Sequence, residues 1–366
     1  MNREQENLRN LTKELCLIPG LSGYESNVRK FIERRLKKLK LKFETDILGN
    51  LVCTLKGNPA YPSVMLFAHM DQIGFIVKKI EDNGFIKVER VGGVPEKTLP
   101  STDVVVINDK DQEINGVIGN KSHHVTLPKD RYVVPSYRDL YLDFGFESYK
   151  ETISHGVNVG SPITYKPSFN DIGKYRMVGT SIDDRAGCAI IIDMIKDLLK
   201  VKNIPTVHLV FSVQEEFNLR GVVPLARKLN PDIAIQLDIS ISADTNETFD
   251  TGNIKLNNGP CMSMYSFHGR GTLNGLIPHP QLVTLINDTA KKNKINLQRI
   301  ATSGLLTETS YVQLLGKGVA CIDMGFPVRY SHSPNEICDI RDLTQLKKLL
   351  ILSLKNTKNN LHLKRN

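Results

Sequence analysis

The sequence predicts an α/β protein with a mixed, largely parallel β-sheet, helices on both faces of that sheet, and an inserted all-β module. Apolar runs typical of buried strands alternate with helical segments in residues 1–73 and 168–366, which we expect to form one α/β domain. Residues 74–167 instead alternate apolar and polar side chains over short runs separated by Gly, Asn and Asp turns. With 40% hydrophobic and 24% charged residues, the chain of 366 residues can bury a full-sized core.

The N-terminal segment predicts two helices followed by three strands. The first helix ends at a Pro-Gly pair, a basic amphipathic helix follows, and the next two runs form a hairpin around Gly49-Asn50. The run VMLFA is continuously apolar, as expected for a strand covered on both faces. In chain order these elements are residues 4–17, 28–42, 42–47, 51–55 and 64–68.

After the all-β module, helices and strands alternate again, which indicates parallel strands joined by crossover helices. No internal repeat or low-complexity stretch interrupts this pattern. We expect helices over residues 186–200, 219–229, 280–293 and 342–354, and strands over 207–213, 233–237 and 319–324.

The composition excludes several classes of protein. The net charge is +9, and residues 28–42 carry eight Lys or Arg against Glu33, but no nucleic-acid-binding motif accompanies them, so we expect a solvated helix face. Six cysteines without a CxxC pair predict reduced, buried thiols rather than disulfides or a thiolate zinc site. The first ten residues are polar and no apolar run could span a bilayer, so we expect a cytoplasmic protein that binds neither membrane nor nucleic acid.

Acids and histidines follow the predicted strands of the α/β part. Because ligands bind outside the carboxyl ends of such strands, we expect these side chains to meet in one site. One further acid precedes the helix at 186–200, and the last histidine lies in a loop after the strand that ends at Met324. The candidate residues are His69, Asp71, Asp183, Glu215, Glu216, Asp238 and His332.

This set of donors predicts a metal centre. Imidazoles and carboxylates without a thiolate suit Zn, Co or Mn better than an iron–sulfur cluster or a structural zinc. A bridging carboxylate with one His and one carboxylate on each side would hold two ions that activate a water for hydrolysis. In the pair Glu215-Glu216, one carboxylate can bind metal while the other acts as general base, and Asp71 can orient the imidazole of His69.

At these residues the chain resembles the dinuclear metallo-aminopeptidases that assemble as tetrahedral dodecamers, also called glutamyl, deblocking or endoglucanase-M-like aminopeptidases. The resemblance runs along essentially the whole chain, in the same order and with the same spacing. It is carried by PGLSGYE from Pro19, AHMDQIGFIV from Ala68, GTSIDDRAGC from Gly179, VQEE from Val213, LDISISADT from Leu237 and RYSHSPNEICDIRDL from Arg329.

The resemblance implies a zinc-exopeptidase-like α/β domain with an inserted β-barrel-like domain over residues 74–167 that mediates dimerisation. It implies an aminopeptidase with two divalent ions, zinc or cobalt, peptide substrates, and self-association to dimers and a dodecamer. It also implies Glu215 as general base, Asp71 as the orienting acid and a cis peptide bond at Asp183-Asp184. Of the two metals, one would lie on His69, Asp183 and Asp238, and the other on Asp183, Glu216 and His332.

One segment departs from the family pattern. Where the family usually has Gly-Gly-Thr-Asp-Ala, this chain has Leu305-Leu306-Thr307-Glu308-Thr309. The loop lies near the substrate pocket in relatives, so we expect a narrower pocket or a different substrate, unless the loop shifts to fit the leucines. His123 and His124 match a family position where His is common, and we expect them to have a structural or subunit-contact role.

Two alternatives to an aminopeptidase stay open at this point. A hydrolase of the same scaffold could act on an N-acyl amino acid or another small amide, which the departure at Leu305 keeps in play. A non-catalytic basic scaffold with a vestigial metal site is disfavoured by the intact Glu215. A glycosidase is also disfavoured, because it needs two free carboxylates beside the bond, and here the carboxylates are committed to metal.

Overall fold

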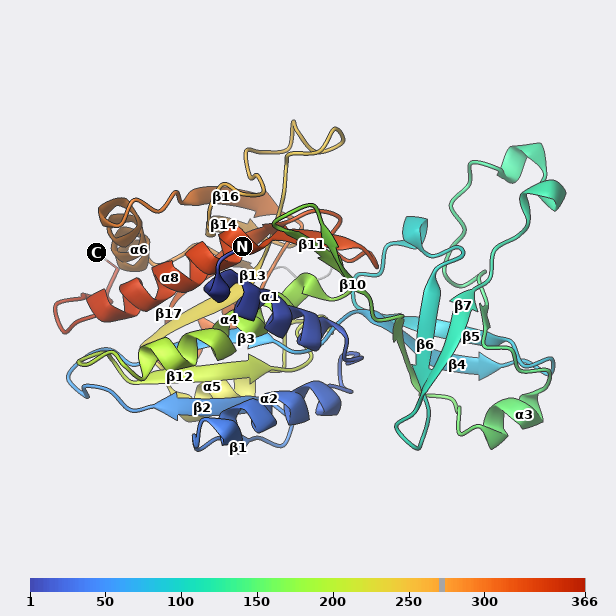
Figure 1. The fold of residues 1–366 in the computed structure, drawn as a ribbon, viewed down its shortest axis with the longest axis horizontal. Coiled ribbons are helices and arrows are strands. Elements are labelled where there is room, and N and C mark those ends of the chain that lie inside the picture. The colour runs from blue at the N-terminus through green and yellow to red at the C-terminus, as the bar shows by residue number, and fades with distance from the viewer. Residues whose placement is uncertain (270–273, 366) are drawn as a thin grey trace.

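The α/β part is built on a nine-stranded sheet whose central strands are parallel (Figure 1). The computed structural model describes residues 1–269 and 274–365. Strand order is β1-β2-β12-β3-β13-β17-β14-β15, with β16 beside β14; β12, β3, β13 and β17 run parallel to one another. The strands are β1 Glu44–Thr45, β2 Leu51–Leu55, β3 Val64–His69, β12 Val207–Ser212, β13 Ile233–Ile241, β14 Cys261–Phe267, β15 Gly275–Leu276, β16 Gln298–Ser303 and β17 Ala320–Val328.

Helices cover both faces of this sheet, because alternate side chains of a strand point to opposite faces. In β3, Val64 and Leu66 pack into a core with α1, α2, α4, α6 and α8, whereas Met65 and Phe67 pack on the other side with α5 and α7. The predicted fold class is confirmed. The helices are α1 Arg3–Cys16, α2 Ser26–Lys38, α4 Ile182–Leu198, α5 Val223–Leu229, α6 Pro280–Lys292, α7 Thr309–Val312 and α8 Ile340–Asn356.

The all-β module is a closed six-stranded barrel with strand order β4-β5-β8-β7-β6-β9, at the right of Figure 1. It has an apolar core of its own, which includes Phe75, Val104 and Ile163. Its strands are β4 Gly74–Ile80, β5 Ile86–Val91, β6 Asp103–Ile107, β7 Glu113–Ile118, β8 Leu142–Asp143 and β9 Pro162–Tyr165. The short helices are η1 Glu96–Thr98, η2 His123–Val125, η3 Pro128–Asp130 and α3 Tyr149–Ser154, none of which is longer than two turns.

A small antiparallel sheet lies where the chain returns from the barrel to the α/β part. It consists of β10 Phe169–Ile172, β11 Arg176–Gly179 and β18 Glu336–Asp339. Its register pairs Gly179 with Glu336, so the segment just before α8 approaches the start of α4. The sheet therefore brings two segments together that are far apart in the sequence.

Several predicted boundaries are wrong. β13 and β17 pair in parallel over nine residues each, so Asp238 lies inside β13, opposite Gly325, rather than after the strand. Hydrogen bonding to the neighbouring strand extends β13 past its acid, which the polarity of that residue alone did not indicate. Helix α5 begins at Val223 instead of 219, and β14 and β16 lie where no strand was predicted. Helix α4 is bounded at Ile182, but Asp183 and Asp184 have non-helical backbone angles, so its regular turns begin close to the predicted residue 186.

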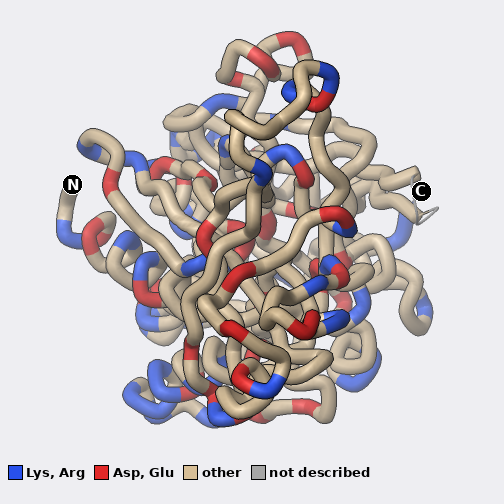
Figure 2. Tube along the Cα trace, turned by 90° about the vertical axis from the view of Figure 1, so that its right-hand side faces the viewer, with Lys and Arg blue, Asp and Glu red and all other residues tan. Residues whose placement is uncertain are grey.

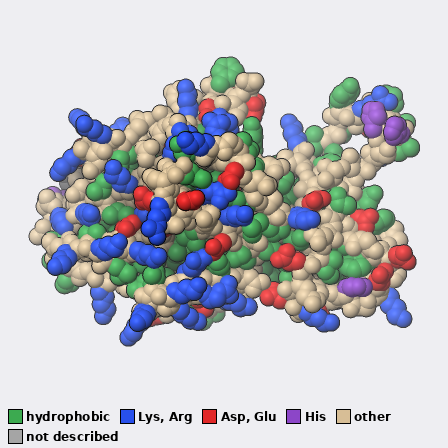
Figure 3. Space-filling view, in the orientation of Figure 1, with side chains coloured by type: hydrophobic (Ala, Val, Ile, Leu, Met, Phe, Trp, Pro, Cys, Tyr) green, Lys and Arg blue, Asp and Glu red, His purple; other side chains and the backbone are tan. Residues whose placement is uncertain are grey.

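Charge is distributed unevenly over the surface. In Figure 2, Lys and Arg gather at the lower left of the molecule, and in Figure 3 many of them cover the α/β part. In α2, Val28, Ile32 and Leu36 are buried and no basic residue is, which agrees with a solvated basic face. All six cysteines are free and buried, as predicted. Within the described residues, no helix is both long and apolar enough to cross a membrane.

Candidate metal centre

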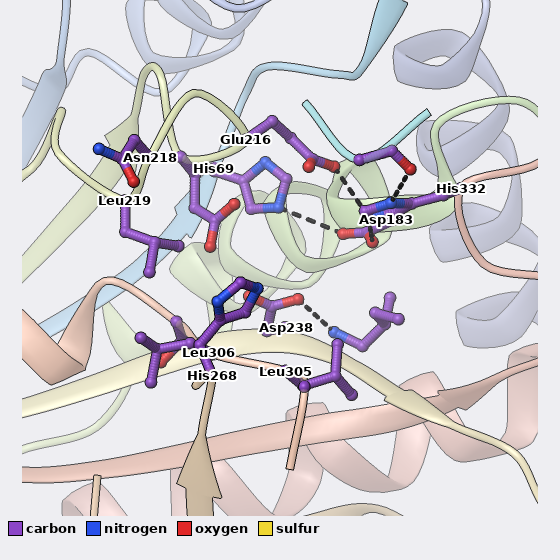
Figure 4. Close-up of a pocket in the computed structure, with 15 residues that line it drawn as sticks. His69, Asp183, Glu216, Asn218, Leu219, Asp238, His268, Leu305, Leu306 and His332 are labelled. Carbon is purple, nitrogen blue, oxygen red and sulfur yellow. Dashed lines mark hydrogen bonds and ion pairs between the residues drawn. The ribbon is translucent and has the colours of Figure 1, made fainter. Parts of the chain in front are cut away.

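Five of the predicted side chains meet at the carboxyl edge of the central strands (Figure 4). His69 ends β3, Asp183 lies in the first turn of α4, and Asp238 lies within β13. Glu216 and His332 lie in the loops after β12 and β17. They form two groups that share Asp183, and within each group the possible ligand atoms lie within 4.8 Å of one another: His69, Asp183 and Asp238, and Asp183, Glu216 and His332.

Asp183 occupies the middle of this arrangement. Its Oδ1 lies 3.2 Å from Nε2 of His69, and its Oδ2 lies 3.5 Å from Nε2 of His332. The same Nε2 of His332 is 3.3 Å from Oε1 of Glu216. The two oxygens of one carboxylate thus face two different imidazoles, which is the geometry that a bridging ligand requires.

The imidazoles are oriented in a way that fits a cation. Nδ1 of His69 lies 3.2 Å from the backbone oxygen of Asp71, and Nδ1 of His332 lies 3.0 Å from the backbone oxygen of Gly93. A carbonyl oxygen only accepts, so each Nδ1 donates its hydrogen to that oxygen, and Nε2 of each ring is left to face a carboxylate. A lone pair facing a carboxylate is repulsive unless a proton or a metal ion lies between them, so the donor set fits divalent metals.

The buried charges of the site perturb one another strongly. Burial raises the pKa of Asp238, and the Asp183 carboxylate raises it further. Burial would also raise the pKa of Asp183, but the imidazoles of His332 and His69 outweigh it and hold that pKa low. Burial by itself would lower the pKa of His69, but the carboxylates of Asp183 and Asp71 outweigh it and raise that pKa. Such a crowd of carboxylates is relieved by added positive charge.

Asp71 holds the loop after β12 more directly than it holds the imidazole. Its carboxylate is 3.6 Å from Nδ1 of His69, beyond a hydrogen bond, and the closer contact is through its backbone oxygen. The carboxylate instead accepts hydrogen bonds from the backbone N–H groups of Glu215 and Glu216, both at 3.0 Å. The hydroxyl of Ser22 also donates to it. Asp71 therefore fixes the backbone that carries the Glu-Glu pair.

Glu336 has a similar role on the other side of the site, and the sequence analysis missed it. Its carboxylate accepts hydrogen bonds from the backbone N–H of Asp183 at 3.0 Å and of His332 at 2.7 Å. Burial and the Asp183 carboxylate raise the pKa of Glu336 to about 8. The available signal was an acid that opens the short strand β18, four residues after His332.

A cavity of about 340 Å³ opens onto the metal ligands. Glu215 lines it although the residue is only 6% exposed, and Leu305 and Leu306 form part of its wall. Glu308 is fully buried and does not line it. The cavity is also lined by residues that sequence analysis did not single out, among them Asn218, Leu219, Ile239 and His268.

The barrel reaches the site only through backbone. A Cβ built on Gly93 would lie 2.9 Å from Nδ1 of His332, and one on Gly92 would lie 3.4 Å from Oε2 of Glu216. Gly92 also has φ of +82°, which side chains disfavour. Glycine at these positions lets the barrel approach both side chains closely.

Two further predictions concern the peptide bond after Asp183 and the histidine pair of the barrel. The peptide bond Asp183-Asp184 is cis, as predicted. His123 and His124 lie in η2, on the arm of residues 119–140 that projects from the barrel, with histidine side chains near its tip in Figure 3. They belong to neither metal group nor to the lining of the cavity.

Comparison with known proteins gives the class of the chain. Residues 49–349 match the model of the M42 glutamyl aminopeptidase family. Over 336 residues the chain is 37% identical to SgcX of Escherichia coli K12, which is named provisionally as an aminopeptidase; the match covers 90% of this chain and 89% of SgcX.

Solved structures agree with this match. Aminopeptidase APDkam598 from Desulfurococcus kamchatkensis is 31% identical with a TM-score of 0.91, covering 98% of this chain and 97% of that one. The TET1 peptidase of Pyrococcus horikoshii, which can assemble into a tetrahedron or a large octahedral shell, is 29% identical with a TM-score of 0.84, covering 96% and 99%. The chain belongs to the M42 glutamyl aminopeptidase family, and it is a metal-dependent aminopeptidase.

Proposed function

We propose that this aminopeptidase works with two divalent ions and with Glu215 as its general base. The observation that carries the proposal is the position of Asp183, whose two oxygens face different imidazoles. Zinc or cobalt suits the donor set of nitrogen and oxygen ligands. The residues that would hold the ions are His69, Asp183 and Asp238 for one, and Asp183, Glu216 and His332 for the other.

When bound, the two ions supply Lewis-acid activation of the attacking water and stabilise negative charge on the scissile carbonyl oxygen. Glu215 takes a proton from the water whose oxygen bonds to the carbonyl carbon, and it passes that proton to the leaving amine nitrogen as the C–N bond breaks. Burial raises the pKa of Glu215, which favours a carboxylate that both accepts and returns a proton. Asp71 holds the backbone of Glu215 in place for both transfers.

Leu305 and Leu306 give the cavity a branched aliphatic wall, together with Leu219 and Ile239. This supports the expectation that the substrate pocket differs from that of relatives with two glycines in this loop. It also keeps one alternative testable, in which the same centre hydrolyses an N-acyl amino acid or another small amide.

The barrel is proposed as a separate domain, residues 74–167, that mediates dimerisation, with residues 1–73 and 168–366 forming the catalytic domain. Self-association into dimers and a dodecamer is supported by the tetrahedral assembly of the Pyrococcus horikoshii relative. The projecting arm of the barrel also carries exposed apolar side chains, which are typical of an interface. They are Val125, Leu127, Tyr132, Val133 and Val134.

A panel of unblocked and N-acetylated peptides tests the function. Metal-free, zinc-loaded and cobalt-loaded protein are incubated with each peptide, and the products are identified by mass spectrometry. Stepwise loss of N-terminal residues from unblocked peptides alone, and only with metal, supports the proposal. Turnover restricted to N-acyl compounds would favour the amidohydrolase, and no loss of activity on removing metal would contradict the metal mechanism.

A further inference from the structure

The loop that carries Glu215 and Glu216 is closed at its neck. It leaves β12 after Ser212 and reaches α5 at Val223. Its two ends touch, since a Cβ built on Gly221 would lie 1.5 Å from the backbone oxygen of Val213. We call residues 213–222 the base loop.

Asn50 holds this neck from one side. Its amide oxygen accepts from the backbone N–H of Val213 at 3.1 Å, and its amide nitrogen donates to the backbone oxygen of Gly221 at 2.7 Å. Asn50 is fully buried and lies just before β2. One side chain thus binds the first residue of the base loop and a residue near its end.

Glu308 makes a second tie across the same neck. Its Oε2 accepts from the hydroxyl of Ser212 at 2.7 Å, and its Oε1 accepts from the backbone N–H of Val222 at 2.8 Å. Each carboxylate oxygen therefore takes one end of the base loop. The residue is 0% exposed.

The segment that presents Glu308 is itself anchored to the sheet. The hydroxyls of Thr307 and Thr309 donate to Asp323 of β17, and the backbone N–H of Thr309 donates to the side-chain oxygen of Gln236 of β13. The preceding residues, Leu305 and Leu306, line the cavity. Glu308 thus connects the base loop to the segment whose leucines form another part of the cavity wall.

A carboxylate is an unfavourable group to bury, and no ion pair of Glu308 with a basic side chain occurs in the part of the chain that the structure describes. Burial raises its pKa to about 7. A buried acid that is not among the proposed metal ligands, and whose two oxygens both hold one loop, indicates a role beyond filling space.

We propose that Glu308 is a positioning residue for the reaction: its carboxylate ties the two ends of the base loop and so fixes Glu215 relative to the cavity. The kinetic consequence rests on the proposed function, in which Glu215 is the general base. A shift of about 1 Å in such a group can lower a rate by about a hundredfold.

Three substitutions test the length and charge of this tie. Glu308→Ala leaves Ser212 and Val222 without their acceptor. Glu308→Gln keeps the length of the side chain. Its amide oxygen can accept from the backbone N–H of Val222, and its amide nitrogen can donate to the hydroxyl oxygen of Ser212. The hydroxyl hydrogen of Ser212 can then be donated to the backbone oxygen of Ala68, 3.5 Å away. Glu308→Asp keeps the charge but is too short to reach both ends.

Asp342→Ala is the matched control. Asp342 is also buried, also has a pKa raised by burial to about 7, and also accepts two hydrogen bonds, in its case both from backbone N–H groups, of Asn257 and Gly259 at 2.6 and 2.8 Å. Neither of these two hydrogen bonds involves a residue of the base loop. Any general effect of removing a buried acid therefore appears in both variants.

The readouts are kcat and KM of the zinc-loaded protein, and hydrogen exchange of the amides of residues 213–222. We expect Glu308→Ala to lower kcat at least tenfold with KM changed less than threefold, Glu308→Asp to be intermediate, and Glu308→Gln to stay within threefold of wild type. Exchange in the base loop should rise at least tenfold in Glu308→Ala and not in Asp342→Ala.

Equal losses of kcat in Glu308→Ala and Asp342→Ala would overturn the proposal, as would unchanged kcat in folded Glu308→Ala. If the wild-type protein hydrolyses no peptide, the proposed function fails, and the exchange experiment then decides alone. Unchanged exchange in the base loop of Glu308→Ala would overturn the proposal in that case too.

Discussion

The α/β part and the barrel both have closed apolar cores, but only the α/β part buries charge. Within residues 74–167 no Asp, Glu, His, Lys or Arg side chain is buried. In the α/β part, by contrast, Asp71, Glu308 and Glu336 are buried and accept hydrogen bonds from the backbone. Burying acids is unfavourable, so their concentration in one part locates the chemistry there. The barrel contributes backbone at Gly93 and an exposed arm.

The largest effect should come from the general base. In Glu215→Gln the metal ligands are intact, but the side chain no longer takes a proton, so we expect metal content to be retained while kcat falls by about 10²–10⁴. Metal analysis and peptide hydrolysis measure both. Near-normal turnover would place the proton transfer elsewhere in the site.

The second prediction concerns the pH dependence of stability that a buried acid gives to the α/β part. The pKa of Glu308 is raised to about 7, so its contribution to stability is present below the unfolded pKa of about 4.5 and is lost as the pH rises through 7. Relative to Glu308→Gln, wild type should lose up to about 3 kcal/mol of unfolding free energy between pH 4.5 and 8. Denaturant titrations at several pH values measure it, and parallel curves for the two proteins would exclude a buried, titrating Glu308.

The third prediction tests the backbone contribution of the barrel. In Gly93→Ala, the new Cβ would lie 2.9 Å from Nδ1 of His332, so the imidazole must change its position relative to Asp183 and Glu216. We expect metal affinity to fall about tenfold, measured by competition with a chelator. Lys97→Ala, an exposed position nearby, is the control. Equal metal affinities in the two variants would show that the backbone of the barrel at Gly93 does not position His332.

The smallest effect on activity should come from the arm. Tyr132 is 95% exposed and Val133 is 63% exposed, so Tyr132→Ser with Val133→Ser removes apolar surface without touching either core. We expect a smaller assembly in light scattering, with kcat within about threefold of wild type. An unchanged mass would move the subunit contacts away from the arm. A large loss of kcat at a reduced mass would show that assembly itself supports the site.

Much of the fold was predictable because its signals are local. The continuous apolar run at Val64–Ala68 identified β3, and the short alternating runs after Gly74 indicated the all-β module that closes into the barrel. The boundaries were less certain: β13 extends past Asp238 because β17 pairs with it along its whole length. β14 and β16 were missed for a similar reason, because each is a strand through its pairing with the other, and residues 268–297 separate them in the sequence.

The sequence by itself determined the kinds of residue that reach the site, since His69, Asp183, Glu216, Asp238 and His332 each stand at or near the end of a recognisable element. Only the tertiary structure decided what holds them. Asp71 binds the loop of Glu215 across 144 residues, Glu336 binds Asp183 across 153, and Glu308 binds Val222 across 86. The pattern of apolar residues within one segment indicates where a strand ends, but a hydrogen bond between distant segments depends on register and packing of the whole chain. No pattern within one segment can specify it.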